Sequence, residues 1–130
     1  MQVDNQTLMV NTDKAPKAIG PYSQARWAGN ILFCSGQIAL DTTGKLIGGG
    51  IKEQMRQVMK NLKAVLEKAN LDFDDVVKTE VYMVDLEEFS EMNEVYSKYF
   101  DKLLPARQAV EVSRLPKNAK VEVSMIAYKR

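Results

Sequence analysis

Two predicted strands of this 130-residue chain carry apolar side chains on both of their faces. In the strand predicted over residues 31–40, Ile31 and Phe33 alternate with Leu32 and Cys34. The strand predicted over residues 76–84 repeats the pattern, with Val77, Val81 and Met83 on one face and Val76, Tyr82 and Val84 on the other. Because successive side chains of a strand point to opposite sides of a sheet, a sheet built from these strands needs apolar cover on both sides.

The sequence predicts only two helices to provide that cover, at residues 51–69 and 86–103, from apolar residues at helical spacing. The first stripe comprises Ile51, Met55, Val58, Met59, Leu62, Val65, Leu66 and Ala69, and the second Phe89, Met92, Val95, Tyr96, Tyr99, Phe100 and Leu103. Further strands are predicted at residues 7–11, 23–28, 107–113 and 121–128. The order of elements predicts an α+β fold over residues 1–130, a single domain with one mixed sheet and both helices on one face.

The sheet face without helices is expected to be buried by other copies of the chain. An uncovered face of this kind would be a large exposed apolar patch on a monomer. Closed cyclic symmetry is then the expectation, and the pattern by itself does not choose between a dimer and a trimer.

Composition excludes several kinds of site. The chain has no histidine and one cysteine, Cys34, so a Cys/His zinc site, a Ser-His-Asp triad and a Cys-His nucleophile pair are all excluded. A net charge of +1 with scattered basic residues argues against nucleic acid and anionic membranes as partners. No apolar run approaches the roughly 20 residues of a membrane span. The N-terminus lacks the basic and apolar regions of a signal peptide, so we expect a cytoplasmic protein.

Arg107 and Glu122 are the candidate catalytic residues. Arg107 follows Pro105 at the start of a predicted strand, and Glu122 lies on the next strand. A guanidinium presents a planar fork that matches a carboxylate. We therefore expect Arg107 to hold a small carboxylate substrate and Glu122 to position a water beside it. A glycine inside a strand, Gly36, predicts a bulge or a close approach by backbone or ligand.

Several motifs together resemble the RidA-type reactive-intermediate deaminases over about residues 10 to 129. They are Gly20-Pro21-Tyr22-Ser23-Gln24, Ser35-Gly36-Gln37-Ile38, Asn61 to Leu66, Asn93-Glu94-Val95-Tyr96 with Tyr99-Phe100, Pro105-Ala106-Arg107, Val110-Glu111-Val112 and Arg114-Leu115-Pro116-Lys117.

The resemblance implies a chorismate-mutase-like fold and a homotrimer whose sheets form a central barrel, with ligand sites in the clefts between subunits. The implied activity is hydrolysis of 2-imino acids, such as 2-iminobutanoate and 2-iminopropanoate, to 2-keto acids and ammonia, with no cofactor and no metal. These imines are products of pyridoxal-phosphate dehydratases. The resemblance also places Tyr22, Ser35, Gly36 and Asn93 in the cleft, and the backbone carbonyl of Ala109 is expected to accept from the imine nitrogen.

The chain departs from the family pattern at three positions. Gln108 stands where a small hydroxyl residue is usual, Ala109 where cysteine or threonine is usual, and Ser124 at a frequently acidic position. These changes bear on substrate preference. A non-catalytic, regulatory trimer that binds 2-keto acids is the alternative function, and a protein- or RNA-directed role is a third. The presence of both Arg107 and Glu122 favours the enzyme, because binding alone needs only the arginine.

Overall fold

The protein forms one six-stranded sheet with its two main helices on one side. The computed structural model describes residues 5–130. The elements are α1 (Asn5–Leu8), β1 (Met9–Val10), β2 (Ala25–Ala28), β3 (Ile31–Gln37), α2 (Ile51–Lys68), η1 (Phe73–Asp75), β4 (Val76–Met83), η2 (Leu86–Glu88), α3 (Phe89–Tyr96), β5 (Ala106–Glu111), η3 (Pro116–Asn118) and β6 (Val121–Tyr128). The strand order is β1-β2-β3-β6-β4-β5. The sheet is mixed, because β4 and β5 are parallel and the other pairs are antiparallel. The predicted fold class is confirmed.

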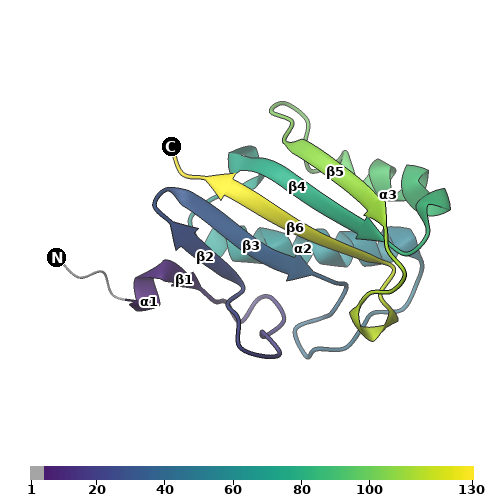
Figure 1. Cartoon of the computed structure of the whole chain (residues 1–130), viewed down its shortest axis with the longest axis horizontal. Helices are drawn as coiled ribbons and strands as arrows, with labels where there is room; N and C mark the ends of the chain where they lie inside the picture. The colour runs from purple at the N-terminus through teal and green to yellow at the C-terminus, as the bar shows by residue number, and fades with distance from the viewer. Residues whose placement is uncertain (1–4) are drawn as a thin grey trace.

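The core lies between the sheet and α2 and α3, which both sit behind the sheet in Figure 1. Strand β6 shows the alternation, since Val121, Val123, Met125 and Ala127 are buried while the residues between them are not. The stripe predicted for the first helix is confirmed, because Met55, Val58, Met59, Leu62, Val65 and Leu66 are all fully buried. The amphipathic pattern of α2 therefore determines which face of the helix packs against the sheet.

The other side of the sheet, which we call the open face, carries a group of exposed apolar side chains. It carries Ile31 and Phe33 of β3, Ile126 and Tyr128 of β6, and Val110 of β5. Phe33 is 47% exposed and Tyr128 is 44% exposed. Within residues 5–130, no helix packs on this face (Figure 1). The two-sided apolar pattern seen in the sequence therefore corresponds to one buried and one exposed side of the sheet.

Three predicted elements differ in extent from the structure. The strand predicted at residues 31–40 ends at Gln37. The second helix ends at Tyr96 rather than near residue 103, and Leu103 is 53% exposed. Its last turn tightens, because the Lys98 and Tyr99 amides bond three residues back, and the Ser97 hydroxyl donates to the Glu94 carbonyl at 2.9 Å. The strand predicted at residues 7–11 is a short helix followed by a two-residue strand, Met9–Val10.

No helix in residues 5–130 is both long enough and apolar enough to cross a membrane.

Cys34 is expected to be chemically inert in the native protein. Its side chain points into the core, and burial raises the pKa of the thiol to about 12. At pH 8 only about one thiol in ten thousand would then be ionised, and the thiolate is the reactive form. A thiol reagent such as dithionitrobenzoate should therefore label the urea-unfolded chain stoichiometrically and the native protein hardly at all. Rapid labelling of the native protein would contradict this assignment.

Candidate functional site

Arg107 lies on the helix-covered side of the sheet. It pairs in register with Thr79 of β4, a fully buried residue, so both side chains point toward α3. The guanidinium Nη1 donates to Asn93 Oδ1 at 2.6 Å. Its central carbon is 4.7 Å from the centre of the Tyr96 ring and 5.3 Å from the centre of the Phe89 ring. The guanidinium is therefore held by an amide and two aromatic rings, and all three come from one helix.

A cavity of about 410 Å³ opens beside this guanidinium. It is lined by Asn93, Tyr96, Ser97, Phe100, Leu104, Pro105 and Arg107. Arg107 is exposed, and no acidic side chain within residues 5–130 forms an ion pair with it. Four of the five guanidinium N–H groups remain after the bond to Asn93. The arrangement suits a small carboxylate.

Glu122 lies on the open face instead. It alternates with the buried Val121 and Val123 along β6. Its carboxyl rests against the β3 bulge, where a Cβ added to Gly36 would be only 2.6 Å from Oε2. The predicted bulge is confirmed by a register shift between Cys34 and Gln37. Glycine at position 36 thus leaves the space that the Glu122 carboxyl occupies, and a larger residue there would displace the carboxyl.

The Glu122 carboxyl occupies a cavity of about 360 Å³. Apart from Gly36 and Glu122, the cavity is lined by Pro16, Lys17, Ile19, Tyr22, Gln24, Gln37, Ile38, Leu40, Pro116 and Lys117. Burial raises the pKa of the Glu122 carboxyl above its ordinary value. A carboxylate partly withdrawn from water is a stronger base than an exposed one. A general base that works near neutral pH needs a pKa raised in this direction.

The remaining candidate residues divide between the two cavities. Tyr22 lies in the Glu122 cavity, and its hydroxyl accepts from the Ile19 amide at 3.3 Å. The Ser35 hydroxyl is occupied, because it donates to the Ser23 carbonyl at 2.6 Å and so ties the Tyr22 segment to β3. Asn93 belongs to the Arg107 side. Ala109, in register with Val81, points to the same side of the sheet as Arg107 but lines neither cavity.

Gln108 is not beside the Arg107 guanidinium. It points to the open face, where its amide donates to Glu80 Oε2 at 3.4 Å. The Ser124 hydroxyl donates to the other Glu80 oxygen at 3.3 Å. Two of the three positions that depart from the family pattern therefore meet at one acid on the open face.

A single chain does not bring Arg107 and Glu122 together, because their side chains leave the sheet on opposite sides. The Arg107 guanidinium and the Glu122 carboxyl are separated by the sheet. The sequence motifs identified both residues. The face of the sheet on which each one lies depends on strand register and on the β3 bulge.

The sequence did not predict a role for four residues near Arg107 and Glu122. Phe89 and Tyr96 belong to the predicted core stripe, although their spacing from Asn93 places all three on one helix face. Lys17 and Lys117 line the Glu122 cavity, and the Lys117 ammonium donates to the Gly44 carbonyl at 3.2 Å. Lys117 has a φ of 56°, an uncommon left-handed conformation for a residue with a side chain.

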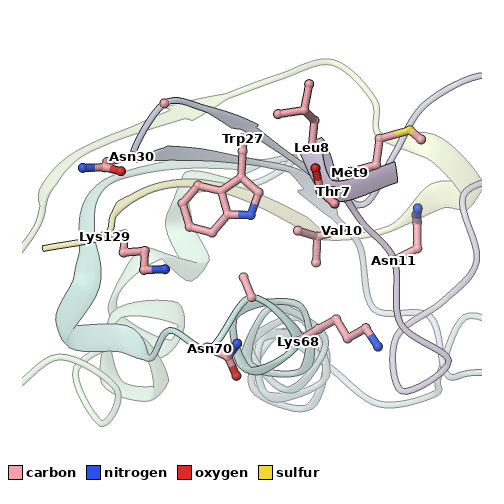
Figure 2. Close-up of a pocket in the computed structure, with 12 residues that line it drawn as sticks. Thr7, Leu8, Met9, Val10, Asn11, Trp27, Asn30, Lys68, Asn70 and Lys129 are labelled. Atoms are coloured by element: carbon pink, nitrogen blue, oxygen red, sulfur yellow. The ribbon is translucent and has the colours of Figure 1, made fainter. Parts of the chain in front are cut away.

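A larger cavity of about 580 Å³ lies elsewhere, and it includes none of the candidate residues. Figure 2 shows it between β1, the β2–β3 hairpin and the C-terminal end of α2, with Trp27 above Asn70 and with Lys68 and Lys129 at its sides. Size alone therefore does not identify the functional site of this chain.

Comparison with known proteins places the chain in a family. The family model described as Endoribonuclease L-PSP matches residues 12–129. A RutC family protein of Pyrococcus horikoshii is 54% identical, over 93% of this chain and 97% of its own length. The mouse 2-iminobutanoate/2-iminopropanoate deaminase is 45% identical, over 92% of this chain and 89% of its own. The crystal structure of E. coli TdcF with bound serine superimposes with a TM-score of 0.88 at 39% identity, covering 94% of this chain and 98% of that one.

The match spans nearly the whole of each chain, and it agrees with the fold. This chain therefore belongs to the Endoribonuclease L-PSP family, which is the RidA-type family that its motifs resemble.

Proposed function

We propose that this protein hydrolyses 2-imino acids to 2-keto acids and ammonia, in sites formed between copies of the chain. The observation that carries the proposal is the pair of complementary half-sites. One has a guanidinium fork that forms no ion pair within residues 5–130, and the other has a carboxyl of raised pKa. The 45% identity to the mouse deaminase supports the reaction, and the serine bound by TdcF supports a ligand with a carboxylate next to a nitrogen-bearing carbon.

The chemistry needs no covalent nucleophile, because a protonated imine is already an electrophile. In the proposed reaction Arg107 binds the substrate carboxylate through two parallel hydrogen bonds. Glu122 takes a proton from water as the oxygen bonds to the imine carbon, which gives a carbinolamine. The same carboxyl then returns a proton to the nitrogen. As the C–N bond breaks, the Glu122 carboxylate accepts the hydroxyl proton, and the 2-keto acid and ammonia leave. Alignment of the water with the imine carbon is the main contribution of the protein.

The remaining residues take supporting roles in this proposal. Tyr22 and Gly36 line the side of the site next to Glu122, and Ser35 holds the Tyr22 segment in place. Asn93 orients the guanidinium. The carbonyl of Ala109 accepts from the imine nitrogen, which requires only backbone, so the absence of a thiol or hydroxyl at position 109 is compatible with the reaction.

The open face supports assembly of the chain into a homotrimer. Its exposed apolar side chains need a partner, and a second copy that packs there would bring its own Arg107 side toward Glu122 of the first. Three equivalent clefts would then form around a central barrel of sheets. This arrangement accounts for the location of the two half-sites on opposite sides of one sheet.

Replacement of Arg107 tests the carboxylate site. Arg107→Ala is expected to lower kcat/KM for imine hydrolysis by about 100-fold, and Arg107→Lys by about tenfold, because lysine keeps the charge and loses the fork. The assay generates 2-aminoacrylate with a serine dehydratase and measures how far the protein reduces semicarbazone formation. If Arg107→Ala keeps the wild-type kcat/KM, Arg107 does not bind the substrate carboxylate. A wild-type protein that binds 2-oxobutanoate and leaves semicarbazone formation unchanged would instead support the non-catalytic alternative.

Glu122→Gln tests the base. The variant is expected to lose about 100-fold or more in kcat, in the range of general acid–base catalysis. In wild type the rate should fall on the acid side with an apparent pKa above the roughly 4.3 of an unperturbed glutamate, because burial raises the pKa of Glu122. The acid limb should disappear in Glu122→Gln. Full activity of Glu122→Gln in a folded oligomer would show that Glu122 is not the base.

The same substitution should stabilise the fold at neutral pH. Because the folded-state pKa of Glu122 is raised, its favourable contribution is complete at low pH and is lost as the pH rises through the folded-state value. Glutamine is neutral at every pH and avoids that loss. The melting temperature of Glu122→Gln should therefore exceed that of wild type at pH 7, and the difference should shrink toward pH 4.

Subunit mixing tests whether the two half-sites come from different chains. Arg107→Ala and Glu122→Gln are each expected to be nearly inactive. Unfolding them together in equal amounts and refolding should restore about one quarter of the wild-type sites in a trimer, since one interface in four pairs an intact arginine with an intact glutamate. Each variant refolded alone is the control. A site confined to one chain predicts no recovery.

A further inference from the structure

One face of α3 is built around the Arg107 guanidinium. Phe89, Asn93 and Tyr96 follow one another at intervals of four and three residues, which places them on the same side of the helix. All three contact Arg107, one by a hydrogen bond of 2.6 Å and two through aromatic rings. We call the rings of Phe89 and Tyr96 the aromatic platform.

Tyr96 is the more firmly held member of the platform. Its side chain is only 7% exposed, and its hydroxyl lies 2.8 Å from the hydroxyl of Thr79, which is fully buried. Thr79 is also the residue of β4 that pairs with Arg107 across the sheet. Thr79, Tyr96 and Arg107 thus form a closed triangle in which the two strand residues are neighbours and the tyrosine of α3 contacts both.

Burial raises the pKa of the Tyr96 hydroxyl, and the hydrogen bond shared with Thr79 and the charge of Arg107 oppose that shift. The hydroxyl therefore stays neutral at physiological pH, and the ring keeps the electron-rich face that attracts a cation.

The side chain of Arg107 needs contacts that hold it in one conformation. Arg107 is an exposed residue on β5, an edge strand of the sheet, and a long side chain loses rotamer freedom when it binds a ligand. The amide of Asn93 restrains one nitrogen of the guanidinium. A ring stacked against the group restrains its plane, and that plane determines whether both oxygens of a carboxylate are reached together.

We propose that Tyr96, anchored by Thr79, is a positioning residue that sets the plane of the Arg107 guanidinium for bidentate carboxylate binding. The proposal rests on the proposed function, in which Arg107 holds the substrate carboxylate. Tyr96 acts through Arg107 and does not itself touch the reacting atoms. Its contribution should appear in substrate affinity more than in the chemical step.

Three variants separate positioning from packing. Tyr96→Leu removes the ring and keeps an apolar side chain, and Tyr96→Phe keeps the ring and loses only the bond to Thr79. Tyr99→Leu is the matched control, because Tyr99 is an aromatic residue of the same segment that packs edge-on against Phe73 at 5.3 Å and does not line the Arg107 cavity. Thermal unfolding of each variant identifies losses due to the fold alone.

Tyr96→Leu is expected to raise KM for the imine, and the Kd for 2-oxobutanoate, by roughly 3- to 30-fold, the range of a cation–π contact. Its kcat should change less than KM. Tyr96→Phe should lie nearer wild type than Tyr96→Leu, and Tyr99→Leu should match wild type in KM even where its melting temperature falls.

The Nε–Hε signal of Arg107 in an ¹⁵N spectrum gives a readout that does not depend on activity. The chain has five arginines, and Arg107→Lys identifies the signal. Ring currents should shift this signal in wild type, Tyr96→Phe and Tyr99→Leu, and the shift should diminish in Tyr96→Leu. A Tyr96→Leu variant with unchanged KM and an unchanged Arg107 signal would overturn the proposal. A wild-type protein without deaminase activity would overturn the proposed function, and the spectrum would still decide the role of Tyr96.

Discussion

The structure depends on one constraint, which is that two amphipathic helices can cover only one side of a six-stranded sheet. The buried side is complete within one chain, since the stripe of α2 is fully enclosed there. The other side keeps Phe33 and Tyr128 exposed on strands whose alternate residues are buried in the core. The same alternation sends Arg107 and Glu122 to opposite sides. The alternation along the strands therefore explains two features. It leaves one side of the sheet without apolar cover, and it divides the candidate site between the two sides.

Each half-site is supported by a different kind of interaction. On the open face, a bulge and a residue without a Cβ make room for the Glu122 carboxyl, whose pKa is raised by burial. On the helix side, an amide and two rings hold a cation that stays charged and accessible to ligand. The first half provides an acid partly withdrawn from water, and the second provides an exposed cation in contact with an amide and two aromatic rings. Hydrolysis of a small charged substrate uses both properties, one for proton transfer and one for binding.

Hydrophobic periodicity was enough to predict the helix-and-sheet architecture, because packing of α2 and alternation along the strands dominate the folding energy. It did not predict where the second helix ends, because the apolar stripe continues past Tyr96 while the Lys98 and Tyr99 amides bond to carbonyls three residues back. The motifs identified Arg107 and Glu122, but the side of the sheet on which each lies depends on the β4–β5 register and the β3 bulge. The apolar stripe of the second helix predicts only that Tyr96 is buried. Such a stripe does not distinguish a ring that packs in the core from one that also contacts a guanidinium.

The division of the candidate site by the sheet has a consequence for how activity would respond to the amount of protein. Under the proposed function, a folded but solitary subunit is catalytically silent, so turnover rises more steeply than in proportion to concentration until assembly is complete. Newly made chains would contribute nothing until they meet partners. A cell that makes two related chains of this family would also obtain hybrid clefts, in which the arginine of one gene product faces the glutamate of another. Selection would then act on the compatibility of neighbours as well as on each chain.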